Sequence, residues 1–150
     1  MKNPKSCNAL GALILEIDQD MEEAEKHFRF ACESDFALGC TGLGEIENRK
    51  GNTEIAKKHF EYACSKDEQV GCIQLGFIEI SRNDFSQARK LLDPNCKNED
   101  MNACYGMGLV HAHEGNDKMA LSEFTKACLH KVPQACMILK EASKTAEKNQ

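Results

Sequence analysis

The chain has 150 residues, of which 41% are hydrophobic and 29% charged, and this is enough for one elongated globular domain. The formal net charge is −5, and Lys and Arg are scattered along the chain, so we expect no nucleic-acid partner. No apolar run approaches the ~18 residues that a membrane-spanning helix needs, so we also expect no membrane span.

The first predicted element is a helix near the start of the chain. Its apolar stretch over residues 9–15 follows two lysines and superficially resembles a secretory signal. Acidic residues interrupt the stretch, however, and no small-residue cleavage site follows it. The segment also carries Cys7-x-x-Leu10-Gly11, a motif that recurs in every later unit, so we interpret it as a structural helix.

Eight of the nine cysteines form four pairs, and each pair comes 32 residues after the previous one. The pairs are Cys32/Cys40, Cys64/Cys72, Cys96/Cys104 and Cys128/Cys136. A fixed period of this size predicts a repeat protein in which each unit buries its apolar face by stacking on its neighbours. We expect a single domain with units at about 5–36, 37–68, 69–100 and 101–132, followed by a capping helix over 133–149.

Each unit is predicted to open with a helix, called helix A, that begins Cys-x-x-Leu-Gly or a close variant. The five copies start at Cys7, Cys40, Cys72, Cys104 and Cys136. Apolar residues at i, i+3 and i+6 indicate a helix packed on one side. A polar turn with Gly, Asn or Asp follows, and Asp20 with Glu23 has the spacing of a capping box.

A second helix, helix B, completes each unit. It repeats a small residue (Ala24, Ala56, Ala88, Ala120), a large one (Phe28, Phe60, Leu92, Phe124) and a third position (Ala31, Ala63, Asn95, Ala127). Small residues permit close helix approach, and large ones fill the space between units. The sequence therefore predicts an all-α fold, a right-handed solenoid of helix pairs. Pro94 removes a backbone donor late in its helix B, where we expect a bend or an early end.

Each cysteine pair is predicted to join the end of helix B to the start of the next helix A. Two antiparallel helices joined by a short turn bring such side chains within disulfide reach. Zinc is the weaker alternative, because zinc sites use closer cysteine pairs that converge four at a time. Cys7 has no partner in this frame. We expect a half-buried thiol there, with intermolecular pairing or a redox role as alternatives.

The A-C-x7-C-x-x-L-G pattern, repeated over essentially the whole chain, resembles the SEL-one-like repeat superfamily, specifically its Helicobacter cysteine-rich branch. Units of 32 residues with short turns are shorter than the family's usual units of about 36 and place the geometry nearer tetratricopeptide repeats. The resemblance implies disulfides between helix B and the next helix A, export to an oxidising compartment, and protein or peptidoglycan-related binding. Some members are also described as weak penicillin-binding or β-lactam-hydrolysing proteins.

The residues themselves give no support for catalysis, and we expect no catalytic residue, cofactor or metal. A serine β-lactamase needs Ser-x-x-Lys, but Ser86 is followed by Arg89 at this spacing, and Ser143 directly precedes Lys144. His111-x-His113 is the best imidazole pair, yet on a helix its rings would point about 200° apart.

Solenoids of this kind bind partners along the concave surface lined by the A helices. We predict a protein or peptide site there with these residues: Glu45, Ile73, Phe77, Ile80, Tyr105 and Leu109. Acidic residues near this lining favour a partner with basic residues around an apolar anchor. The alternative is that superhelix curvature buries both apolar faces of these helices against neighbouring B helices.

We therefore predict a disulfide-stapled binding scaffold in the periplasm or outside the cell. A β-lactam-hydrolysing protein and a redox or assembly factor that uses Cys7 are the alternative functions. We expect a monomer, with a Cys7-linked dimer as the alternative. No export signal is visible in the sequence, so export requires either a leader that has been removed or another route.

Overall fold

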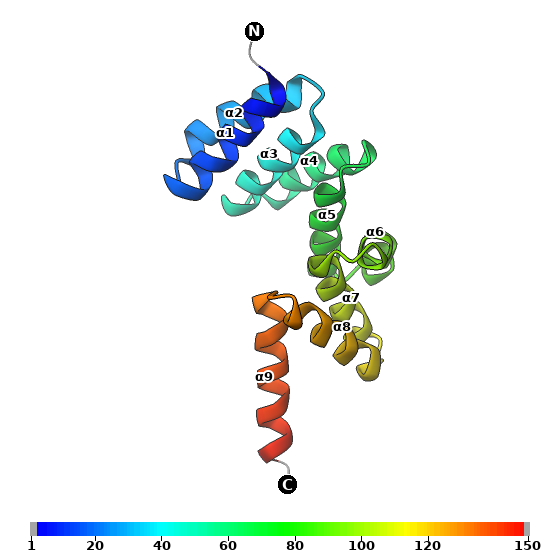
Figure 1. The fold of residues 1–150 in the computed structure, drawn as a ribbon. Helices are drawn as coiled ribbons and strands as arrows, with labels where there is room; N and C mark the ends of the chain where they lie inside the picture. Colours follow the sequence, from blue (N-terminus) through cyan, green and yellow to red (C-terminus); the bar gives the residue numbers. More distant parts are fainter. Residues whose placement is uncertain (1–2, 149–150) are drawn as a thin grey trace. The chain divides into compact units, whose positions relative to one another are not determined.

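The computed structural model describes residues 3–148, with side chains over residues 3–145, and this part of the chain is helical with no strand. The helices are α1 (Pro4–Ile17), α2 (Met21–Glu33), α3 (Ala37–Arg49), α4 (Thr53–Ser65), α5 (Gln69–Ser81), α6 (Phe85–Lys97), α7 (Met101–His113), α8 (Asp117–Leu129) and α9 (Pro133–Lys148) (Figure 1). The predicted all-α fold of helix pairs is confirmed. The last residue of the predicted capping helix, residue 149, lies outside the described residues.

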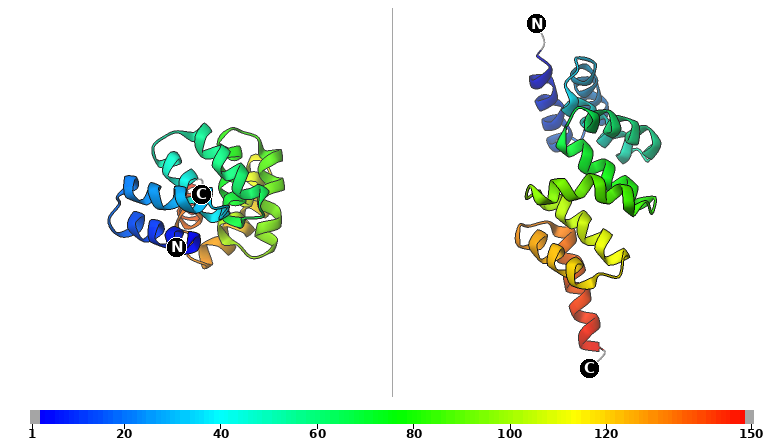
Figure 2. Two further views of the ribbon diagram at one scale, coloured as in Figure 1. Left: turned by 90° about the horizontal axis from the view of Figure 1, so that it is seen from above. Right: turned by 90° about the vertical axis from the view of Figure 1, so that its right-hand side faces the viewer.

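The helices form two compact units that divide within α5, after Leu75. In the first unit α1 packs against α2 and α3, and α3 packs against both α2 and α4. The left view of Figure 2 shows α1 and α2, in blue, lying side by side. In the second unit α6 packs against α7, α7 against α8, and α8 against α9. Within each unit, helices that are consecutive in sequence thus pack against each other from α1 to α4 and from α6 to α9, as expected of an α solenoid.

The turns repeat as regularly as the helices. Each helix A is followed by a turn with one residue of positive φ, at Gln19, Gly51, Asn83 and Gly115. Each helix B is also followed by a turn with one residue of positive φ, at Asp35, Asp67, Glu99 and Lys131. Left-handed residues of this kind end helices because they turn the chain out of the helical path.

Acidic caps begin several of the helices. The Asp20 carboxylate accepts the Glu23 N–H (3.0 Å), and Asp84 accepts the Gln87 N–H (2.9 Å). Only half of the predicted capping box forms, because the Glu23 side chain accepts instead from the Lys26 ammonium (2.7 Å).

The core is built where the large residue of helix B meets a glycine of helix A. Phe60 is 1% exposed and Leu92 is 0% exposed. A Cβ placed on Gly44 would lie 2.5 Å from a Phe60 ring carbon, and a Cβ on Gly108 would lie 2.5 Å from a Phe124 ring carbon. The Leu-Gly motif therefore has a packing cause: only glycine leaves room for the facing ring.

The expected early end of helix B at Pro94 is wrong. Helix α6 continues through Pro94 to Lys97 and is 13 residues long, as α4 and α8 are. The Asn95 amide donates to the Leu91 carbonyl (2.7 Å), and the Asn98 N–H donates to the Pro94 carbonyl (3.1 Å). Pro94 itself has no backbone N–H to donate. The donors on either side of this gap still bond to carbonyls of the last turns, so the helix continues.

The contact between Gly44 and Phe60 predicts the sign of a change in the free energy of unfolding. Gly to Ala in a helix ordinarily stabilises by about 1 kcal/mol, but at Gly44 the added methyl must displace the Phe60 ring. We expect Gly44→Ala to lower the free energy of unfolding by about 1–3 kcal/mol, the usual cost of overpacking. Urea denaturation measures the change.

Phe60→Val provides the matched background, because it removes the ring atoms that meet the new methyl. In that background Gly44→Ala should stabilise the protein. Destabilisation of equal size in both backgrounds would contradict the packing account.

Candidate functional site

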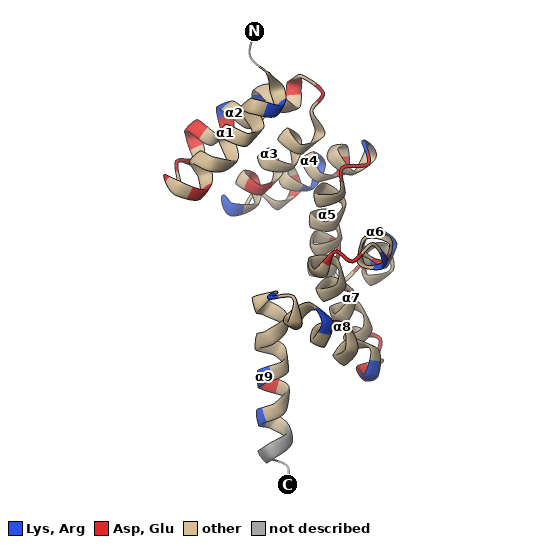
Figure 3. Ribbon diagram, in the orientation of Figure 1, with Lys and Arg blue, Asp and Glu red and all other residues tan. Residues whose placement is uncertain are grey.

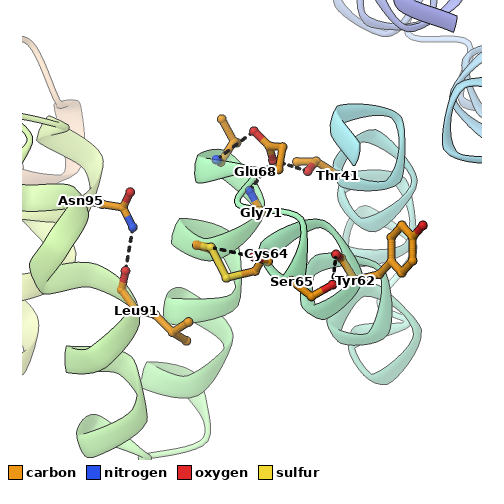
Figure 4. Close-up of a disulfide and its surroundings, with 10 residues drawn as sticks. Thr41, Tyr62, Cys64, Ser65, Glu68, Gly71, Leu91 and Asn95 are labelled. Atoms are coloured by element: carbon orange, nitrogen blue, oxygen red, sulfur yellow. Dashed lines mark hydrogen bonds between the residues drawn. A yellow bond between two sulfur atoms is a disulfide. The ribbon is translucent and has the colours of Figure 1, made fainter. Parts of the chain in front are cut away.

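Disulfides join successive helices at four places. Cys32 is bonded to Cys40, Cys64 to Cys72, Cys96 to Cys104 and Cys128 to Cys136. The Cα atoms of each pair lie 4.5–4.8 Å apart, within the normal range for a disulfide. Each bond links the end of a helix B to the first turns of the next helix A, as Figure 4 shows for Cys64. The bonds fix the hairpins on which any binding surface depends.

Cys7 is the free cysteine, and it is buried in α1, at 9% exposure. Reactive cysteines are usually partly exposed and lie in electropositive surroundings, whereas buried structural cysteines are inert. The burial of Cys7 therefore favours the structural interpretation over a redox role or a link between two chains.

In the first unit, Glu68 connects α3 to the start of α5. Its carboxylate accepts from the Thr41 hydroxyl (2.6 Å) and from the Gly71 N–H (2.7 Å), as Figure 4 shows. The same side chain also accepts the Val70 N–H (3.1 Å). Glu68 is thus an N-terminal cap that also satisfies the buried hydroxyl of Thr41. It is not among the residues predicted from the sequence, where its signal is an acidic residue just before a helix A.

Glu45 lies half-buried on α3 of the same unit. Burial raises the pKa of its carboxyl above the ordinary value of 4.5, the Glu68 charge raises it further, and the Arg49 charge opposes both effects. A carboxylate in such a position would gain from a basic group brought by a partner, because the added charge would offset the cost of desolvation.

In the second unit, Phe77 of α5 and Tyr105 of α7 belong to a group of neighbouring aromatic rings. Phe77, Ile80, Tyr105 and Leu109 are all half-buried. The Phe77 and Tyr105 rings lie 5.8 Å apart between centroids, and Tyr105 lies 6.0 Å from Phe124. Helix α7 contains no Asp, Glu, Lys or Arg and is uniformly tan in Figure 3. The cluster is therefore an uncharged, partly exposed surface.

The core of the second unit supports this surface from below. Tyr105 and Leu109 pack against a buried cluster that includes Phe124 and Val132. Burial also raises the pKa of the Tyr105 hydroxyl above its ordinary value. Part of each side chain thus faces its own core, as the curvature alternative requires, and part remains exposed for a partner.

The predicted binding residues divide between the two units. Glu45 and Ile73 belong to the first unit, and the other four belong to the second. Ile73 is 5% exposed, so it packs in the interior and offers little surface to a partner. A sequence pattern that marks a second apolar face on α5 could not distinguish such a buried position from an exposed one.

The two histidines of α7 have different surroundings. His111 is 6% exposed, and its Nδ1 lies 3.5 Å from an Arg89 guanidinium nitrogen and 3.7 Å from a Glu114 carboxylate oxygen. His113 is exposed, and its ring stacks on Phe85 with centroids 3.6 Å apart. The two rings thus do not share one site, as their spacing on a helix predicts.

Comparisons with protein-family models and with curated proteins found no match. Among the described residues, no helix has both the length and the hydropathy to cross a membrane.

The contribution of one disulfide can be measured with Cys64→Ala/Cys72→Ala. Closing so short a loop (sequence separation 8) stabilises the folded state by about 2.5 kcal/mol in the loop-entropy description. We expect the double variant to lose about that much in guanidinium unfolding without reductant. Cys7→Ala is the control, because it removes a thiol but no bond, and should cost about 1 kcal/mol or less. Equal losses in the two proteins would refute a bracing role.

The raised pKa of Glu45 predicts a pH-dependent effect. Because the folded protein holds this proton more tightly than the unfolded chain, protonation stabilises the fold below pH 4.5, and this contribution is lost as the pH rises through the raised pKa. Glu45→Gln should therefore raise the free energy of unfolding at pH 7 by up to about 1 kcal/mol and leave it nearly unchanged at pH 3.5. Urea unfolding at both values checks this, with Glu141→Gln, at an exposed position within α9, as a control that changes neither.

Proposed function

We propose that the chain is a disulfide-braced scaffold of four 32-residue units that binds a protein or peptide through its A helices. The observation that carries the proposal is the uncharged surface of Phe77, Tyr105 and Leu109 in the second unit, half-exposed on a rigid support. Aromatic side chains held by a packed core bind partners at low entropic cost, because little motion is lost on binding.

The surface defines the chemistry of the partner. An extended or helical segment with an apolar or aromatic anchor would fit the Phe77 and Tyr105 rings. In the first unit, the half-buried Glu45 carboxylate would favour Lys or Arg. We therefore expect the partner to combine an apolar anchor with basic residues.

Four disulfides indicate an oxidising compartment, because cytosolic thiols are kept reduced. We propose the periplasm or the extracellular space as the location. This proposal agrees with the resemblance to cysteine-rich SEL-one-like repeat proteins, which implies export.

The test begins with a random peptide library displayed on phage and selected against the oxidised protein. Selected peptides are then synthesised, and their Kd is measured by fluorescence anisotropy. We expect an apolar anchor with flanking Lys or Arg. Phe77→Ala and Leu109→Ala should each weaken binding at least about tenfold, equivalent to 1.4 kcal/mol.

Met137→Ala is the control variant. It removes an apolar side chain that is 62% exposed on α9 of the same unit, so binding should not change. Thermal unfolding shows whether each variant is folded. Peptides that bind all three variants as tightly as the parent protein would place the binding surface elsewhere.

A further inference from the structure

A pocket of about 220 Å³ in the second unit is lined by residues of α6, α7 and α8, beside the Cys96–Cys104 disulfide. Met107 and His111 line it from α7, and Met119 and Glu123 line it from α8. It includes none of the predicted binding residues, so a ligand in this pocket would bind independently of the proposed peptide site.

The helix register brings these four side chains together. Met107 and His111 are four residues apart on α7, and Met119 and Glu123 are four residues apart on α8, so each pair lies on one helix face. Gly108 faces the Phe124 ring, which sets the register of the two antiparallel helices. In this register all four side chains line the same pocket.

The side chains from α7 are almost fully buried. Met107 is 3% exposed and His111 is 6% exposed. The Nδ1 atom of His111 is directed to Arg89 and Glu114, neither of which lines the pocket. The Nε2 edge of the ring is therefore the edge available to the pocket. Because Nδ1 and Nε2 lie at different corners of the imidazole, the outer contacts can orient the ring without occupying Nε2.

The Glu123 carboxylate lies beside the Cys96–Cys104 disulfide. Its Oε2 lies 3.4 Å from the Cys96 sulfur, but a disulfide sulfur carries no hydrogen, so this contact is not a hydrogen bond. Within the described part of the chain, no hydrogen-bond donor or ion-pair partner contacts this carboxylate. A half-buried carboxylate in this situation is stabilised by a nearby cation.

We propose that this pocket binds one Cu(I) ion through Met107, His111 and Met119, with Glu123 supplying negative charge. Thioether sulfur selects soft Cu(I), and imidazole is a common ligand for copper. Cys96 and Cys104 are bonded to each other and supply no thiolate. Lys97, which pairs with Asp93 (2.6 Å), and Lys126 also line the pocket, so its two acidic and two basic side chains carry no net charge, which favours a monovalent ion over a divalent one.

The repeat provides suitable replacements for these donors. The positions that correspond to Met107 in other 32-residue repeats hold Leu43, Leu75 and Leu139, and the position that corresponds to Met119 in the repeat over residues 37–68 holds Ile55. Met107→Leu and Met119→Ile therefore remove sulfur while restoring residues that the same fold already accommodates.

The experiment is an anaerobic Cu(I) titration in competition with a chromophoric Cu(I) chelator. The background is Cys7→Ser, because a free thiol would itself bind Cu(I), and mass spectrometry verifies that all four disulfides persist. We expect one equivalent to bind. Met107→Leu and Met119→Ile should each lower the affinity at least about tenfold, and the double variant should bind no Cu(I) at the same protein concentration.

Met137→Leu is the matched control, because its thioether lies on α9 outside the pocket, and it should bind as the parent does. A second measurement uses Ag(I) as a diamagnetic probe. The ¹³C-methyl resonances of Met107 and Met119 should shift on addition of Ag(I), whereas those of Met101 and Met137 should not. Unchanged affinity in the double variant, or Zn(II) binding as tight as Cu(I) binding, overturns the proposal.

Discussion

The contact between one large side chain of helix B and a glycine of helix A is the constraint on which the rest of the structure depends. Phe60 on Gly44, Leu92 on Gly76 and Phe124 on Gly108 bring the paired helices close enough to exclude water. Alanines at the neighbouring B positions are buried completely or nearly so and complete this close approach. Phe28 also packs with Leu43 and Ile46 of the next helix A, so each small core joins one helix pair to the next. Because each core is small, each 32-residue repeat buries little apolar area. A repeat therefore needs further stabilisation.

The disulfides provide this support where one helix pair joins the next. They close the turn between one helix pair and the next, and so stabilise the connection between successive repeats. In a solenoid, stability is a sum of unit and neighbour contributions, so a constraint at each junction makes the array more cooperative. This arrangement suits an oxidising compartment and would fail in a reducing one, where the junctions would depend on polar caps such as Glu68.

The fold is predictable because its signals are local and repeated. Cysteine spacing, the Leu-Gly motif and the polar turns each recur at 32 residues, so an error in a single copy changes little. The prediction at Pro94 fails because a proline in the last turn of a helix removes only one backbone hydrogen bond, and the chain beyond it still bonds in helical fashion, as the Asn98 N–H does to the Pro94 carbonyl. The burial of Ile73 cannot be predicted from the sequence, because a helical pattern gives the direction of a side chain but not what lies opposite it. The donor set of the pocket is invisible in the sequence for the same reason, since Met107 and Glu123 line one pocket only through the way α7 packs against α8.

Helix α7 is where the chain departs most from its own repeat. It has no Asp, Glu, Lys or Arg side chain, and it carries Met107 and His111 where α3 and α5 have Leu and Glu. Tyr105 and Leu109 are displaced from this pair by two residues, which corresponds to about 200° around a helix. The aromatic surface and the pocket therefore lie on opposite sides of one helix. Because the two faces use different side chains, substitutions on one face can remove peptide binding and substitutions on the other can remove metal binding. The activity that is lost then identifies the face of α7 that provides it.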